Sequence, residues 1–425
     1  MHPLQPLPLR RWCEKLTIGH KLLVMTITTA IASHPTPSEL VRVRAPLSET
    51  WPLFTVLLSS ACIVVGLLWD ISWHKSIGRD TFWTAPHLLE QLGAILAGVS
   101  CGWMVLRATF AGGPAMRGQS VRFWGFSGPL GAWVTIWGTF TMVTSAPFDD
   151  WWHNAYGLDV KIVSPPHIVL ALGMIAIQLG AMLLLLAAQN RASRPAEVRR
   201  LGWGYAFAGG VLLTMMATLV SEYAARPNDM HNTLFYQVAG GTFPVFLAAF
   251  ARSGRLRYPA TSAAGLYFGI VLLMIWILQL FPARPQLAPI YNPVTHMLAP
   301  EFPLFLVVPA LGIDLLLQWA GHRHDWLLTL ALGVLFVAFL ALVQWFFAMF
   351  LLSPHARNWF FGVDQWPYFI KPGDWQYRFW RVPRDAAGNL SLSQLARGLG
   401  IAVLIACGSV RIGLWWGNGM SRVQR

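Results

Sequence analysis

Residues 168–188 read IVLALGMIAIQLGAMLLLLAA, a run of apolar and small residues without a charge. About 20 such residues form a helix that is long enough to cross the hydrocarbon core of a bilayer. Working outward from this run, the sequence contains nine more apolar runs of similar character. The ten predicted spans are 51–69, 88–106, 124–147, 168–188, 202–221, 235–251, 262–281, 302–319, 327–352 and 395–416.

The composition points the same way. Of the 425 residues, 55% are hydrophobic and only 12% are charged, whereas soluble domains carry about 25% charged residues. A large soluble domain is therefore excluded, and we predict an all-α, polytopic membrane bundle of about ten transmembrane helices. Three of the 4 cysteines lie inside apolar runs and none forms a CxxC pair, which excludes a disulfide scaffold and a thiolate metal site.

The formal net charge of +13 is a topology signal. Most of the 31 Lys and Arg residues fall in the N-terminal segment, in alternate loops and in the C-terminal tail, as the positive-inside rule requires of cytoplasmic segments. We therefore expect a protein of a bacterial-type inner membrane with both termini in the cytoplasm. Its partner is the lipid bilayer, and nucleic acid is not needed to explain the charge.

We expect five segments along the chain: a cytoplasmic N-terminal segment with an interfacial helix, a four-helix unit, a five-helix unit, an outer aromatic-rich segment, and a last span with a cytoplasmic tail. These are residues 1–50, 51–190, 191–352, 353–394 and 395–425. The interfacial helix is expected at Leu22–Ser33, with a signal peptide as the alternative. The Trp, Tyr and Arg residues of 353–394 favour an interfacial lid, with a docking surface as the alternative.

Two outer loops carry the same pattern, Asp-x-x-Trp-His, then Gly-x-Asp, then Ser/Thr-x-Pro-His. The key residues are Asp70, His74 and His87 in the first loop, and Asp149, His153 and His167 in the second. Each Asp and the first His are four residues apart and so share one face of a helix. The Pro before the second His is typical of the first turn of the next helix. We therefore expect a repeated helical hairpin with one carboxylate and two imidazoles at its outer end.

Two histidines and a carboxylate from adjoining helices make a competent site for a first-row transition metal. Copper, iron and zinc all suit this ligand set, and the affinity order favours copper. Arg79, Asp80 and Asp159 are candidates for orienting a ligand histidine, and Glu90 is a candidate extra ligand. The alternative is that the Asp and His residues are polar caps at the membrane interface, duplicated and retained for packing only.

At these residues the sequence resembles the C subunit of particulate methane monooxygenase and ammonia monooxygenase, a family of membrane copper oxygenases. The resemblance covers roughly residues 50–190. Its first copper site is similar to Asp70-x-Ser72-Trp73-His74, Arg79-Asp80-Thr81, Thr84 and His87. The second loop is similar to the second copper site, although the family has Asn at the position of Asp149.

The resemblance implies copper on the periplasmic face, able to activate O2 for hydroxylating a small apolar substrate. It also implies partner subunits and an electron donor, either a quinol or a redox protein.

Further polar residues extend the list of candidates. The later hairpins are interpreted as decayed repeats, in which Glu222, His231, His296 and Glu301 are candidate ligands or ligand-orienting residues. Asp314 lies inside a predicted span, where an ionisable side chain is expensive, so it is a candidate proton relay.

Three functions remain open from the sequence. The first is a copper-dependent monooxygenase or a subunit of one, and the second is a non-catalytic protein for copper handling or oxidase assembly. The lack of an outer Met-x-x-Met cluster among the 14 Met residues disfavours the second. The third is a structural membrane subunit with relic sites. Whether the chain is an enzyme stays undecided at this point.

Overall fold

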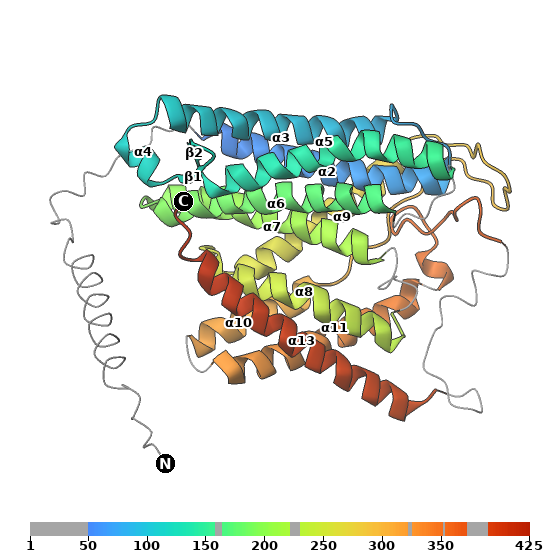
Figure 1. Cartoon of the computed structure of the whole chain (residues 1–425). Coiled ribbons are helices and arrows are strands. Elements are labelled where there is room, and N and C mark those ends of the chain that lie inside the picture. The colour runs from blue at the N-terminus through green and yellow to red at the C-terminus, as the bar shows by residue number, and fades with distance from the viewer. Residues whose placement is uncertain (1–49, 158–163, 222–229, 322–324, 352, 372–389) are drawn as a thin grey trace, which may run out of the picture. The chain divides into compact units, whose positions relative to one another are not determined.

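The computed structural model describes residues 50–157, 164–221, 230–321, 325–351, 353–371 and 390–425, which belong to one compact unit. The expected interfacial helix at Leu22–Ser33 lies outside the described residues. The longer helices are α2 (Trp51–Ser76), α3 (Ala85–Phe110), α5 (Leu130–Tyr156), α6 (Pro165–Arg191), α7 (Pro195–Ser221), α8 (Thr233–Ser253), α9 (Pro259–Leu278), α10 (Val307–Ala320), α11 (Asp325–Leu351) and α13 (Leu392–Met420). The shorter elements are α4 (Pro114–Gly118), the 3-10 helix η3 (Pro354–Ala356), β1 (Val121–Phe123) and β2 (Phe126–Gly128) (Figure 1).

The prediction of a helical membrane bundle is confirmed. Among the described residues, 8 helices are long and apolar enough to cross a membrane: α2, α3, α6, α7, α8, α9, α11 and α13. Helix α5 is long enough but is not among them, because its Thr and Ser residues and the acidic pair Asp149 and Asp150 lower its hydropathy. Helix α10 has 14 residues, about 21 Å, which is short of the ~30 Å hydrocarbon core. The helices thus support eight spans by length and composition, not ten.

The start of α5 also differs from the expected span of 124–147. Residues 121–128 form an antiparallel hairpin of β1 and β2 instead, with Val121 opposite Gly128. Trp124 and Gly125 at its turn both have positive φ, 48° and 87°, as a tight two-residue turn with the right twist requires. The helix begins only after Pro129, which cannot donate a backbone hydrogen bond.

Glycines allow the helices of the first half to approach closely. A Cβ atom on Gly138 of α5 would lie 2.8 Å from the carbonyl oxygen of Gly173 on α6, and the reverse pair gives 2.9 Å. Small residues at such a crossing let two backbones touch, which is the usual way that membrane helices pair tightly. The α5–α6 hairpin is therefore held as a close antiparallel pair, and α2 and α3 form the neighbouring hairpin.

The two hairpins, α2–α3 and α5–α6, lie side by side (Figure 1). Thr139 of α5 donates a hydrogen bond to the carbonyl of Ala94 on α3 at 3.0 Å, and Gly128 packs against Val105 further along α3. Since residue numbers rise along α3 while they fall along α5, the helices are antiparallel. The end of α5 therefore lies at the same end of the bundle as the start of α3.

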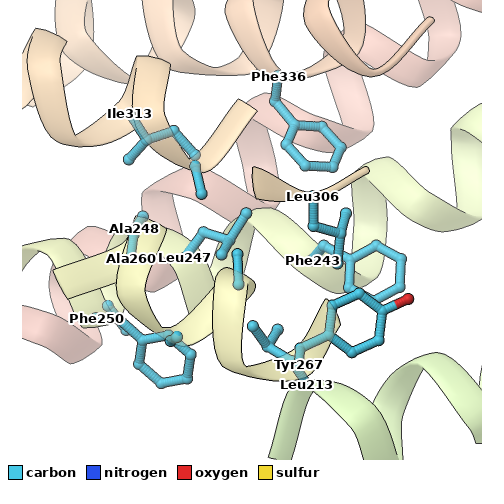
Figure 2. Packing of buried hydrophobic residues seen from close by; sticks show 14 of the residues in the cluster. Leu213, Phe243, Leu247, Ala248, Phe250, Ala260, Tyr267, Leu306, Ile313 and Phe336 are labelled. Atoms are coloured by element: carbon cyan, nitrogen blue, oxygen red, sulfur yellow. The ribbon is translucent and has the colours of Figure 1, made fainter. Parts of the chain in front are cut away.

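The second half has its own apolar core, drawn in Figure 2, in which Phe243, Tyr267, Leu306 and Phe336 are buried together. Helix α13 packs along α8, and α9 packs along α7, which joins this half to the first. The connection between α9 and α10 is a long non-helical segment, residues 279–306. That segment runs past the C-terminal end of α2 and contributes to the site described next.

Candidate metal centres

The first cluster combines Asp70 and His74 from the last turns of α2, Asp80 from the loop, and His87 from the first turn of α3. One ligand atom from each lies within 4.8 Å of all the others. Nε2 of His87 is 3.1 Å from Oδ1 of Asp70 and 3.5 Å from Oδ2 of Asp80. Nε2 of His74 is 3.7 Å from Oδ2 of Asp70 and 3.4 Å from Oδ2 of Asp80. Four donor atoms thus converge on one point.

These separations fit a first-row metal ion. Such metals bind imidazole nitrogen and carboxylate oxygen at about 2.0–2.2 Å, so two ligands that subtend about 90–110° at the ion are about 2.9–3.5 Å apart. Oδ1 of Asp70 is buried, and the polar group that it meets among the described residues is Nε2 of His87, at 3.1 Å. The two atoms are as far apart as two ligands of one ion.

The loop of the first cluster is a closed turn that orients its ligands. The carbonyl of Thr81 lies 2.9 Å from Nδ1 of His87, and Thr84 bonds both the amide and the carbonyl of Thr81. A carbonyl can only accept, so Nδ1 carries the proton and Nε2 keeps its lone pair for a metal. The indole of Trp73 donates to the carbonyl of Arg79 at 2.8 Å, which ties the other arm of the turn to α2.

Asp80 remains a carboxylate in this setting. Burial alone raises the pKa of its side chain, but the hydrogen bond with His74 and the attraction of His74 and His87 bring that pKa below its ordinary value. Sequence reasoning expected Asp80 to orient a ligand, whereas its oxygen lies among the ligand atoms themselves. It therefore offers the first cluster a second anionic donor.

The C-terminal end of α2 also contacts three residues far along the chain, Gln286, Leu298 and Tyr368, which together we call the clamp. Leu298 accepts a hydrogen bond from the Ser72 hydroxyl, and its amide donates to Ser76 at 2.8 Å. The amide of Gln286 donates to Ile77 at 2.9 Å, and the amide of Tyr368 donates to Lys75 at 3.4 Å. The ring of Tyr368 lies against Gly78, whose φ is +91°. The clamp thus bonds residues that neighbour Asp70 and His74.

The second cluster repeats the arrangement with three ligands. Oδ2 of Asp149 lies 3.5 Å from Nε2 of His153, one turn later on α5. Oδ1 of the same carboxylate lies 3.5 Å from Nε2 of His167 on the first turn of α6. This Oδ1 is again buried and accepts no hydrogen bond from the described residues. The three donor atoms lie within 4.8 Å of one another.

The histidines of the second cluster are oriented as His87 is. Nδ1 of His153 lies 3.2 Å from the carbonyl of Gly157, which ends α5 with φ +94°. Nδ1 of His167 lies 3.0 Å from the hydroxyl of Ser164, which also caps the start of α6. The carbonyl of Gly157 can only accept, so Nδ1 of His153 carries the proton and Nε2 has the lone pair. Ser164 can hold His167 in the same tautomer. The Ser/Thr-x-Pro-His pattern is the sequence signal for these contacts.

The remaining candidates lie elsewhere or outside the described residues. Asp159 and Glu222 fall outside them. Glu90 is buried against Gly66, and its carboxylate is not among the gathered ligand atoms. The side chain of Arg79 is exposed, and its carbonyl makes the contact already described. Glu301 lines a cavity on another face of α2.

Three further polar candidates belong to other parts of the fold. His231 is buried with its ring 4.7 Å from that of Trp345. His296 pairs with Asp364 at 3.5 Å and with Gln365. Neither histidine joins a metal-binding group among the described residues.

Asp314, the candidate proton relay, accepts hydrogen bonds from the start of a neighbouring helix. Its carboxylate accepts from the amide and the hydroxyl of Thr261, at 2.8 and 2.7 Å, and from the amide of Ala260. These groups open α9, where unpaired amides attract an anion. The capping bonds account for a buried carboxylate inside an apolar helix.

A search of the chain against protein-family models, curated proteins and solved structures finds no match.

Proposed function

We propose that this membrane protein binds a first-row transition metal ion, copper in preference, at each of its two Asp/His clusters. The observation that carries the proposal is the double occurrence of one arrangement. In each cluster a buried carboxylate oxygen faces imidazole Nε2 atoms and no other donor among the described residues, and backbone or hydroxyl partners occupy the Nδ1 side of His87, His153 and His167. Packing alone requires neither feature.

Copper is preferred because mixed imidazole and carboxylate ligands suit it and because it stands highest in the affinity order of divalent metals. Iron and zinc accept the same ligands. The extra carboxylate of Asp80 makes the first cluster more anionic than the second, which favours a doubly charged ion there.

We place both clusters on the periplasmic face of a bacterial-type inner membrane, with both termini in the cytoplasm. In support, Arg107, Arg117 and Arg122 lie on or after the far end of α3, away from His87, and positive loops stay in the cytoplasm. In this topology α5 crosses beside α6 as a less apolar span, and α10 together with the segment before it makes a tenth crossing, because two cytoplasmic termini require an even number of spans. The like-built hairpins α2–α3 and α5–α6 would be copies of one ancestral unit.

The function that we propose for the bound metal follows the resemblance to the copper monooxygenase C subunit. A copper ion held there would supply a redox-active centre for O2-dependent hydroxylation of a small apolar substrate. The chain's own residues hold Nε2 of each histidine in place and keep negative charge at the centre. Electrons would come from a quinol or a redox protein, and partner subunits would complete the enzyme.

The test is the metal content of the detergent-purified protein, measured by elemental mass spectrometry. We expect two copper ions per chain in the wild type, one in His74→Ala, one in His153→Ala and none in the double variant. His355→Ala is the matched control, because His355 is an exposed histidine on η3 outside both clusters. If the wild type holds iron or zinc instead, and the same variants lose it, the two sites stand and the metal differs from the one proposed. No metal even after loading would overturn the proposal.

A second function, copper handling without catalysis, is favoured by the exposure of one ligand. The side chain of His74 is 48% exposed, so a chelator or a partner protein can reach the first cluster. Copper handling predicts rapid loss of copper to a chelator and no reaction of the reduced, loaded protein with O2. Slow exchange together with O2 consumption would favour the oxygenase.

A further inference from the structure

The β1–β2 hairpin connects α3 to α5 at one end of the bundle and is bonded to both helices (Figure 1). An isolated two-stranded hairpin is only marginally stable in water, so these contacts decide where it lies. The indole of Trp133 on α5 donates to the carbonyl of Val121 in β1 at 3.2 Å. In β2, the amide of Ser127 donates to the hydroxyl of Thr109 on α3 at 2.8 Å. The hairpin is therefore held against the helices that it joins.

Aromatic rings continue the hairpin along α5. The ring of Phe123 packs against Trp133 and Trp137, with centroids 5.4 and 6.3 Å apart. At the turn, the ring of Trp124 lies 4.8 Å from that of Phe123 and 5.8 Å from that of Trp137. Trp124 is 78% exposed and Trp137 is 43% exposed. Because α5 packs between α3 and α6, two helices that can cross the membrane, this aromatic surface faces lipid.

The length of α5 sets the depth of the hairpin in the bilayer. Its 27 residues span about 40 Å, which matches a hydrocarbon core of about 30 Å with headgroups on both sides. Trp137 lies about 10 Å along α5 from Leu130. The indole of Trp124 beside it thus reaches the boundary between headgroups and hydrocarbon, which Trp favours. The two strands lie in the headgroup layer.

Arg122 in β1 points away from the helices. Successive side chains of a strand point to opposite faces. Phe123 meets α5, and Gly128, the strand partner of Val121, packs against Val105 of α3, so this face of the hairpin contacts the protein. Arg122 belongs to the other face and is exposed. Its guanidinium therefore extends into the headgroup layer.

Arg117 on α4 reaches the same place. Its guanidinium donates to the carbonyl of Thr109 at 3.2 Å, and the hydroxyl of Thr109 is the group that binds the Ser127 amide. Ser127 lies directly across the strand pair from Arg122, at the ~5 Å between Cα atoms of antiparallel partners. Thr109 and Ser127 thus bring the two arginines together on one side of the hairpin.

No carboxylate among the described residues balances these two charges. Between Glu90 and Asp149 the chain contains neither Asp nor Glu. The arginine–carboxylate pairs that the described residues form all lie elsewhere in the fold. Arg117 and Arg122 are both exposed. They form a positive surface inside the headgroup layer, and its complement is an anion.

We propose that the hairpin binds an anionic phospholipid such as phosphatidylglycerol. Arg117 and Arg122 hold its phosphate, because the guanidinium fork matches phosphate oxygens, and its acyl chains lie along Trp124 and Trp137. A zwitterionic lipid adds an ammonium group that the two arginines repel. A soluble phosphate leaves the aromatic surface uncovered. The site is independent of the proposed metal chemistry, since it contains no ligand of either cluster.

The experiment is photo-crosslinking of the full chain in phosphatidylcholine nanodiscs that contain a small share of phosphatidylglycerol with a photoreactive headgroup. Peptide mass spectrometry locates the label, which we expect within residues 117–128. Each arginine near a charged lipid surface contributes about fivefold in affinity. Arg117→Gln and Arg122→Gln should therefore each lower the labelling about fivefold, and the double variant about 25-fold.

The matched control is Arg255→Gln, because Arg255 is an exposed arginine of the loop between α8 and α9, away from the hairpin. It should leave the label at 117–128 unchanged. Equal labelling by a photoreactive phosphatidylcholine, or full labelling of the double variant, would overturn the proposal. Loss of the label to an excess of soluble glycerol phosphate would assign the arginines to a soluble anion and overturn the lipid assignment.

Discussion

The two clusters share their residue spacing and differ in what holds them. The first has a fourth donor, Asp80, from the loop after α2. In addition, the clamp bonds the C-terminal end of α2 to Leu298, more than 200 positions further along the chain. The second is built, among the described residues, from α5, Gly157, Ser164 and α6 alone. Asp70 is 18% exposed and Asp149 is 33% exposed. Local spacing gathers the ligands in both clusters, and the first is also fixed by long-range hydrogen bonds between described residues.

The largest difference is expected from alanine at the two glycines with positive φ next to the clusters. In Gly78→Ala the new Cβ would collide with the Tyr368 hydroxyl, whereas in Gly157→Ala it meets no described residue within 4 Å. Both substitutions force a side chain into a left-handed conformation, at about 1–2 kcal/mol. The collision adds about 1–3 kcal/mol to Gly78→Ala alone.

Denaturant unfolding in mixed micelles measures the free energy of unfolding of both glycine variants. Equal losses in the two would show that Tyr368 moves aside freely and that the clamp is not rigid.

The carboxylates should give the next largest difference. Asp149→Asn removes the one carboxylate that the described residues supply to the second cluster, so we expect copper affinity there to fall by about 100-fold, about 2.7 kcal/mol. Asp70→Asn leaves Asp80 in place, and we expect only about a 10-fold loss at the first cluster. Copper titration followed by electron paramagnetic resonance separates the two sites.

The double variant Asp70→Asn with Asp80→Asn should match Asp149→Asn at its own cluster. If Asp70→Asn alone already equals the double variant, Asp80 is not a ligand.

The smallest effect is expected from a variant that weakens the clamp and leaves every candidate metal ligand in place. Ser72→Ala removes the hydroxyl that bonds Leu298, and we expect about a 3- to 10-fold weaker affinity at the first cluster with the second unchanged. Ser59→Ala is the matched control, because that buried hydroxyl of α2 donates to Thr55 within its own helix. The same copper titration measures both. A loss at both clusters would indicate general destabilisation rather than loss of the clamp.

What the sequence predicts well is local. The four-residue spacing of Asp70 and His74, and the Pro86-His87 start of α3, are enough to place one carboxylate and two imidazoles at one hairpin end, because helix periodicity fixes both faces. The apolar runs likewise predict where helices lie. The position of the Asp80 side chain depends on the turn closed by Thr81 and Thr84, which no periodic pattern encodes.

The sequence does not predict hydrogen bonds between distant residues, or roles that depend on which residues a side chain contacts. Ser72 and Leu298 are 226 positions apart, and nothing in either segment indicates the other. Asp314 is buried, as its place in an apolar run predicts, but the sequence does not indicate its hydrogen-bond partners at the start of α9. The metal, the substrate and the resemblance to the copper monooxygenase subunit stay predictions.

The short length of α10 bears on the surrounding lipid. Leu311, Leu315 and Trp319 on this helix are exposed, and Trp319 is 84% exposed. The apolar surface that α10 offers to acyl chains is therefore only about 21 Å long. A bilayer compresses to match a short hydrophobic wall at a cost of a fraction of a kcal/mol per Å. The capping of α9 by Asp314 resists tilting or sliding of α10 as a way to relieve the mismatch. The membrane should therefore be locally thin beside α10, and the protein should partition toward thinner bilayers.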